Sequence, residues 1–255
     1  MYELTPVQRY NPAYVNGLQL SWTSATTLTV ADGACSDSTN SNDIIVNTAG
    51  VGTVVSNAFA GLNGLDAGAV AASTMYYVYA IADMAGFNPS GFVISLSSTT
   101  PALPAGQFPS GYSLYRLVGF ALTDSSKNFL LFYMDGTGAS RFYQYDVPVS
   151  VTVSASGTSS TYSPLDLSVA VPVVNFGRVQ VYYQWTNNAA ADILNFQPTG
   201  GTGDAWTKKG IAAGVQQDEN MLILPLIATA KPEISYKTSA GTLNTVKVQG
   251  FEFNL

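Results

Sequence analysis

Apolar and polar residues alternate along much of this chain with a period of two, beginning at Gly17. Leu18, Leu20 and Trp22 are separated by single polar residues, and the alternation returns over 27–30 after a short polar turn. This spacing is that of a β-strand with one buried face, because successive side chains point to opposite sides. The first two segments therefore predict a β-hairpin.

Short apolar segments continue through the first half of the chain, separated by turns rich in Gly, Asn, Asp and Pro. Their β-branched and aromatic residues pack well on a pleated surface. The prolines and glycines between 101 and 111 exclude a helix or a central strand there. This pattern indicates a small β-sandwich or barrel. Its further strands are predicted near 44–46, 75–81, 91–97, 115–123 and 129–134.

The sequence DGTGAS at 135–140 predicts a joint between two strand-rich regions. The second region predicts an antiparallel sandwich, for which a jelly roll is one arrangement. Its strands are predicted near 147–153, 165–171, 178–185, 192–196, 221–226, 233–238 and 245–253. We therefore expect an all-β chain with two antiparallel sandwich- or barrel-like domains, 17–138 and 141–255. One or two helical turns are compatible with 66–73, where Asp66 could cap a short apolar run.

Residues 1–16 lack the alternating pattern and contain two prolines, which favour an extended backbone. Tyr2, Tyr10 and Tyr14 lie in this segment. Because tyrosine is enriched at interfaces, we predict an extended N-terminal arm that docks on a partner through these rings. A simple frayed terminus is the alternative interpretation.

Charged residues make up only 10% of the chain, while Ser, Thr, Asn and Gly are abundant. Such a surface suits extensive subunit contact, because buried charges would have to be paired. The net charge of −6 argues against a nucleic-acid partner, which needs clustered Lys and Arg. The N-terminus lacks the features of a signal peptide, and no apolar run is long enough to cross a membrane. We expect synthesis in a cytoplasm and no membrane insertion.

The chain contains no histidine and a single cysteine, Cys35, which we interpret as a buried or incidental thiol. The commonest general base and transition-metal ligand are therefore missing, and no Cys-based metal site can form from one chain. Glycan hydrolysis would need two carboxylates, but the few glutamates form no acidic pair near an obvious aromatic cleft. We predict no catalytic residues, no metal and no cofactor.

The loop from Asp32 to Asp43 is rich in the oxygen groups that Ca²⁺ requires. Its spacing matches no EF-hand, because the glycine and the final bidentate glutamate are missing. Turns in which Asp and Asn side chains bond to the nearby backbone explain the same residues without a metal, and we favour that interpretation.

Five segments, in this order, resemble a module found in structural proteins of tailed bacteriophages, notably fibre and other virion appendage proteins. The resemblance covers 16–135, and the second half only in general character. It implies a non-enzymatic virion component, commonly a homotrimer, which would be assembled in the host cytoplasm and attached to other proteins of a tail, fibre or head. The segments are NGLQLSW at 16–22, SATTLTVADGACSDSTN at 24–40, GLDAGAVAASTMYYVYAIA at 64–82, PALPAG at 101–106 and YRLVGF at 115–120.

Recognition of a host receptor or surface glycan through C-terminal loops is the alternative function. The sequence at 199–210 places Trp206 beside Lys208 and Lys209, and we predict an exposed contact site there. A tryptophan tucked inward is the other interpretation of Trp206. Trp185, which lies within a predicted strand, is expected in the core.

Overall fold

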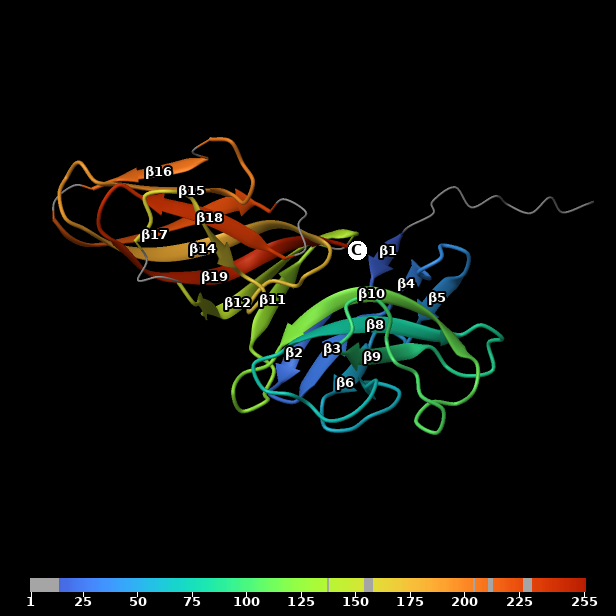
Figure 1. The fold of residues 1–255 in the computed structure, drawn as a ribbon. Helices are drawn as coiled ribbons and strands as arrows, with labels where there is room; N and C mark the ends of the chain where they lie inside the picture. The colour runs from blue at the N-terminus through green and yellow to red at the C-terminus, as the bar shows by residue number, and fades with distance from the viewer. Residues whose placement is uncertain (1–13, 137, 154–157, 204, 211–212, 227–230) are drawn as a thin grey trace, which may run out of the picture.

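Strands make up the regular secondary structure of the described residues, and they pair antiparallel except for the short parallel pair of Gly64–Leu65 with Gly91–Ser95, so the all-β prediction is confirmed (Figure 1). The structure is a computed structural model that describes residues 14–136, 138–153, 158–203, 205–210, 213–226 and 231–255. Within these ranges no helix forms, so the helical turns considered for 66–73 are absent. The same part of the chain accordingly offers no helix of the length and apolarity that crossing a membrane requires.

The first unit contains three small sheets, in the orders β1-β4-β5, β2-β3-β6 and β10-β8-β9-β7. The predicted hairpin is β2–β3, with Trp22 opposite Leu28. Strand β8 is buried along its length from Tyr76 to Asp83, because other elements cover both of its faces. The strands are β1 (Val15–Gly17), β2 (Leu20–Ser24), β3 (Thr27–Val30), β4 (Gly33–Ser36), β5 (Asp43–Val46), β6 (Thr53–Ser56), β7 (Gly64–Leu65), β8 (Met75–Asp83), β9 (Gly91–Ser95) and β10 (Tyr112–Leu122).

The second unit is a sandwich of two sheets, in the orders β11-β12-β19-β14-β17 and β13-β18-β15-β16. The two sheets face each other, since the Tyr183 ring on β14 lies 5.4 Å from the Phe196 ring on β15. Trp185 is fully buried, as predicted. The strands are β11 (Phe132–Asp135), β12 (Ser140–Val151), β13 (Ser163–Asp166), β14 (Phe176–Asn187), β15 (Ile193–Pro198), β16 (Trp206–Lys209), β17 (Gly214–Pro225), β18 (Glu233–Thr238) and β19 (Thr242–Asn254).

This sandwich has the strand order of a jelly roll. When β12 to β19 are lettered B to I along the chain, the sheets read B-I-D-G and C-H-E-F, with β11 added beside B. All of these pairs are antiparallel. The chain therefore passes repeatedly between the sheets in the two Greek keys that define this architecture.

The change from one unit to the other comes earlier than the joint predicted at 135–140. Strand β11 precedes that joint but pairs with β12 in the second unit, with Phe132 opposite Tyr145. The described residues of the DGTGAS sequence thus lie within the second unit, with Asp135 on β11 and Ser140 on β12. This segment connects two neighbouring strands and marks no boundary between sheets.

Aromatic rings from both units meet in one continuous core. Phe120 of β10 packs edge to face against Phe253 of β19, with ring centroids 4.8 Å apart, and lies 6.0 Å from Phe251. All three rings are fully buried. A backbone contact adds to this packing, because the Val173 N–H donates to the Tyr77 hydroxyl over 3.4 Å.

A buried arginine joins the same two units through hydrogen bonds. Arg141, on β12, is 1% exposed and donates from Nη1 to the carbonyls of Leu18 and Val118, at 3.0 and 3.3 Å. Its Nη2 donates to the Gly17 carbonyl, and its Nε donates to Gly138 of its own unit. Burial lowers the pKa of Arg141 to about 10, so the group stays protonated at neutral pH. Backbone carbonyls, with no ion-paired carboxylate among the described residues, therefore solvate this charge.

We predict that Arg141→Met lowers the free energy of unfolding by about 3 kcal/mol, because three carbonyls at the junction lose a charged donor and stay buried. Chemical denaturation monitored by tryptophan fluorescence measures the change. Arg178→Met is the matched control, since Arg178 forms an exposed ion pair with Glu252 and its loss is expected to cost less than about 1 kcal/mol. Equal losses in the two variants would show that the buried arginine does not hold the units together.

Candidate functional site

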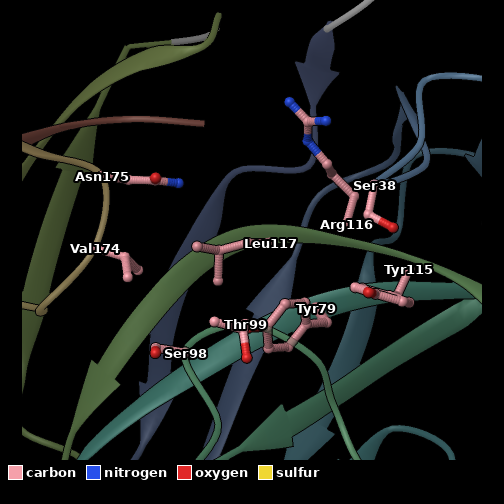
Figure 2. Close-up of a pocket in the computed structure, with 9 residues that line it drawn as sticks. All are labelled: Ser38, Tyr79, Ser98, Thr99, Tyr115, Arg116, Leu117, Val174 and Asn175. Atoms are coloured by element: carbon pink, nitrogen blue, oxygen red, sulfur yellow. The ribbon is translucent and has the colours of Figure 1, made fainter.

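A groove of about 340 Å³ opens where the two units meet (Figure 2). Strands β8 and β10 form its floor, and a turn after β9 forms one wall. The segment before β14, from the second unit, contributes the opposite wall. Because the walls come from both units, the shape of the groove depends on the junction that holds them together. Its lining residues are Ser38, Tyr79, Ser98, Thr99, Tyr115, Arg116, Leu117, Val174 and Asn175.

Two tyrosines on neighbouring strands lie at the floor, where Tyr79 is only 1% exposed and Tyr115 is half-buried. The rings of Tyr79 and Tyr115 meet edge to face with centroids 6.1 Å apart. The Tyr79 hydroxyl donates to the Ser97 carbonyl over 2.9 Å, and burial raises the pKa of Tyr79. The Tyr115 hydroxyl lies 3.1 Å from the Thr100 hydroxyl, and hydrogen bonding to Thr100 and Ser38 lowers the pKa of Tyr115. Both rings are therefore fixed in place.

Arg116 stands at one end of the groove, beside the loop that follows β4. Its Nη1 donates to the side-chain oxygen of Asn40 over 3.1 Å and to the Asp37 carbonyl over 3.4 Å. The Ser38 N–H donates to the Tyr115 carbonyl over 2.8 Å, so the loop is fastened to β10 next to the arginine. Figure 2 shows the Arg116 side chain pointing away from the tyrosine rings. Among the described residues it has no carboxylate ion-pair partner.

The lining offers groups for binding and lacks an activated nucleophile. A serine or threonine hydroxyl needs a neighbouring base before it can attack a substrate. The lining residues include no carboxylate, cysteine or histidine. What they present is an aromatic floor, several hydroxyls, one side-chain amide and one guanidinium. The hydroxyls and the amide can form hydrogen bonds with a polar ligand, whereas the Arg116 guanidinium points away from the tyrosine rings.

No model of a known protein family and no curated protein matches this chain.

The carboxylate of Asp37, in the loop considered for calcium, is occupied by its own loop. It accepts hydrogen bonds from the N–H groups of Ser41 and Asn42, at 2.8 and 3.0 Å, and from the Thr39 hydroxyl at 2.7 Å. Burial would by itself raise the pKa of Asp37, but these bonds outweigh it and lower the pKa. The turn interpretation accounts for this residue without a metal.

The carboxylate of Asp32 is likewise occupied by hydrogen bonds from the protein. It accepts from the Thr48 hydroxyl and from the N–H groups of Thr48 and Gly50, both at 2.8 Å. The Thr48 hydroxyl, followed by the Gly50 N–H, lowers the pKa of Asp32. Across the described ranges no three Cys, Asp or Glu side chains gather in a way that could hold a metal ion.

Asp66 has a different role from the helix cap that the sequence suggested. No helix follows it, and its Oδ2 accepts a hydrogen bond of 2.7 Å from the N–H of Ala102. The carboxyl is buried at this point. Asp66 therefore fastens the proline-rich 101–111 loop to the sheet.

Of the three tyrosines predicted to dock on a partner, the structure describes Tyr14 alone. Tyr2 and Tyr10 lie outside the described residues. Tyr14 is half-buried and pairs with Ser36, whose hydroxyl accepts from the Tyr14 N–H over 3.2 Å and whose N–H donates to the Tyr14 carbonyl over 3.1 Å. Val15 and Asn16, which were predicted as part of the arm, belong instead to strand β1.

Trp206, predicted as an exposed contact, lies half-buried on strand β16. Its ring packs 5.2 Å from Tyr183 and 5.8 Å from Phe196, inside the sandwich. Lys208 is half-buried and lies on the same side of the strand, whereas Lys209 is exposed. The three residues share a strand but do not present one surface, because successive side chains alternate between its two faces.

The groove itself was missed by sequence reasoning. Tyr79 and Tyr115 were predicted only as strand residues, and Arg116 was not singled out. The signal that could have found it is the sequence Tyr115–Arg116, where a charge interrupts an otherwise apolar strand. That signal does not reveal Val174 or Asn175, which the fold brings in from a distant part of the chain.

The lowered pKa values of Asp32 and Asp37 predict a loss of stability in acid. The unfolded state takes up protons first, near pH 4, so the free energy of unfolding decreases as the pH falls from there through the lower folded-state values. Asp37→Asn should show a shallower decrease, and Thr39→Ala, which removes one bond to Asp37, an intermediate one. Urea denaturation at a series of pH values tests this, and identical pH dependence in all three proteins would contradict it.

Proposed function

We propose that this chain is a non-enzymatic structural protein of a tailed-phage virion, which forms or anchors an oligomeric fibre, tail or head appendage. The junction between the two units carries the proposal. The buried Arg141 and the Phe120 cluster make one continuous body from two sandwich-like parts, as a load-transmitting component requires. The ordered segments at 16–135, which resemble a phage appendage module, support the same interpretation.

The jelly-roll order of the second unit agrees with this role by analogy, because viral capsid domains use that architecture. The analogy is limited, since lectins and cupins use it too and fold alone does not define function. The groove lining gives no support for a catalytic function, because it includes no carboxylate, cysteine or histidine.

Exposed apolar side chains favour assembly of several copies. Phe87 is 90% exposed and Val51 is 80% exposed, and Ile45, Val54 and Ile223 are also more than half exposed. With few charges on the chain, such residues can be covered by a second subunit without burying unpaired ions. We propose a homotrimer, located in the virion, that contacts other virion proteins through its N-terminal segment.

Recognition of a host receptor or glycan remains the second function. The exposed Lys209, in a chain with a net charge of −6, is the observation that favours it at the C-terminal unit.

The purified chain should have a mass in solution three times its calculated 26.9 kDa. Light scattering coupled to size-exclusion chromatography measures this mass. A monomer at every concentration used would argue against a trimeric component.

Removal of residues 1–13 should prevent incorporation into particles without changing the melting temperature. The deletion stops before Tyr14 and β1, so the folded unit stays intact. Removal of residues 1–16 is the contrasting variant, because it deletes part of β1 and should also lower stability. Incorporation of the 1–13 deletion at wild-type level would rule out docking through this segment. A combined Tyr2→Ala, Tyr10→Ala variant separates the tyrosine rings from the backbone.

A further inference from the structure

We propose that Phe87, in the loop between β8 and β9, docks into a groove between β2 and β11 of a second copy of this chain. This loop, residues 84–90, is called the tip loop, and the groove is called the edge groove. The inference rests on the proposed oligomer and names two surfaces that would form it. Figure 1 shows β2 and β11 beside each other where the units meet, and β8 running from there to the far end of the first unit.

The tip loop exposes two large apolar side chains. Phe87 is 90% exposed and Met84 is 69% exposed. The loop has the sequence MAGFNPS, which contains no charged residue. Burial of exposed apolar side chains is favourable, so a cluster of them is typical of an interaction site.

The buried carboxylate of Asp83 holds the tip loop in one conformation. Its Oδ1 accepts from the Ala85 N–H over 2.9 Å, and its Oδ2 accepts from the N–H groups of Phe87 and Asn88 at 3.2 and 3.1 Å. The side-chain amide of Asn88 donates to the same Oδ2 over 2.7 Å. Because the loop is already ordered, it loses less conformational freedom on binding.

The edge groove has the size and polarity to receive the Phe87 ring. Its volume is about 360 Å³, and no charged residue is among the described residues that line it. A cavity of roughly 150 Å³ accommodates a benzene ring, so the groove has room for the Phe87 ring and a neighbouring side chain. Its lining combines buried apolar residues such as Leu20 and Phe132 with exposed ones such as Ser21 and Tyr133.

Two side-chain hydrogen bonds shape the edge groove before a partner arrives. The Gln19 Nε2 donates to the Met134 carbonyl over 2.7 Å, and the Trp22 Nε1 donates to the Phe129 carbonyl over 3.0 Å. These bonds join β2 of the first unit to the segment that contains β11. The groove is therefore preformed, as the tip loop is.

The strands that flank the edge groove also offer backbone groups to a partner. Both β2 and β11 lie at an edge of their sheets. The Gln19 carbonyl accepts a hydrogen bond from the residue after β3, and the Leu131 carbonyl accepts one from β12. Bonding direction alternates along an antiparallel strand, so the backbone groups of the next residues, Leu20 and Phe132, point to the groove side. They can pair with the backbone of an incoming loop.

The tip loop cannot reach the edge groove of its own chain. Met75 begins β8 and pairs with Leu122, whose carbonyl accepts from the Leu130 N–H beside the groove. Asp83 ends this nine-residue strand. With a rise of about 3.3 Å per residue, Asp83 lies roughly 26 Å from Met75. The loop that follows Asp83 therefore meets the groove of another copy.

Charge limits where two copies can touch. Each chain carries a net charge of −6, so copies repel unless they meet where charge is absent, and both surfaces fulfil this condition. A lipid surface fits the tip loop less well, because the loop has no Lys or Arg for anionic headgroups. One loop and one groove per chain make a head-to-tail contact, which closes into a ring, such as a trimer, or continues as a filament.

Two variants of the full chain test the surfaces separately. Phe87→Ser should weaken association at least about tenfold, because it removes the buried aromatic ring of the contact. Ser21→Trp fills the edge groove from an exposed position and should have the same effect. Sedimentation over a range of concentrations measures association, and circular dichroism checks the fold. Val147→Ser, which removes a 70% exposed side chain outside both surfaces, is the matched control and should associate like the wild type.

Disulfide formation between two different variants tests the pairing directly. Cys35 is fully buried, so cysteines introduced at exposed positions react without it. Ala85→Cys in the tip loop, co-expressed with Ser21→Cys at the edge groove, should give a covalent dimer on oxidation. Neither variant alone should give one, because a head-to-tail contact brings different surfaces together.

Three results would overturn the proposal. They are no covalent dimer from the co-expressed variants, a dimer formed as readily by Ala85→Cys alone, and association that Phe87→Ser and Ser21→Trp leave unchanged or weaken no more than Val147→Ser does. Phosphatidylcholine vesicles that bind the wild type but not Phe87→Ser would also overturn it, since the tip loop would then be a membrane anchor. A monomeric wild type would refute the oligomer itself, whereas an oligomer that tolerates Phe87→Ser would refute these surfaces alone.

Discussion

The fold depends on one buried cation that has no counter-ion among the described residues. Arg141 extends from β12 into the first unit and donates to the carbonyls of Gly17, Leu18 and Val118. A buried charge is costly unless hydrogen bonds replace its hydration, and here the backbone supplies them. The three carbonyls also depend on the arginine, because they would lose its N–H donors if the two units separated. The guanidinium therefore specifies how the two units fit together.

The junction explains why a groove exists at all. Aromatic packing around Phe120 and the hydrogen bonds of Arg141 hold β10 against β19 and β12. The Val173 N–H, which donates to the Tyr77 hydroxyl, holds the segment before β14 against β8. The space left beside this contact is lined by side chains from both units. Two arginines thus have opposite environments on neighbouring elements. Arg141 is enclosed and donates hydrogen bonds from all three of its nitrogens, whereas Arg116 is half-buried and donates from Nη1 alone.

Much of the architecture could be predicted from the sequence, because period-two alternation reports directly on strands with one buried face. The β2–β3 hairpin, the buried Trp185 and the all-β class follow from it. The alternation does not say which strands pair, so β11 was assigned to the first unit although it pairs with β12 of the second. It also could not place Trp206 inward, since the facing rings of Tyr183 and Phe196 come from other strands.

The candidate site was less accessible to sequence reasoning for a related reason. Carboxylates such as Asp37 could be interpreted either as ligands or as turn residues, and the favoured turn interpretation agrees with the N–H groups of Ser41 and Asn42 that they bind. Arg141 was not singled out, because burial of a charge depends on tertiary contacts with residues more than a hundred positions away. Local pattern therefore predicted elements well and the roles of polar side chains poorly.

The two ends of the described chain lie close to the junction (Figure 1). Leu255 donates its N–H to the Ala139 carbonyl, two residues from Arg141, and Arg141 in turn reaches Gly17 of β1. A partner that binds the segment before Tyr14 would hold the molecule at the junction between the two units and not at the far end of either unit. Both units would then extend away from the attachment point, and the surface of each unit opposite the junction would stay accessible to other partners.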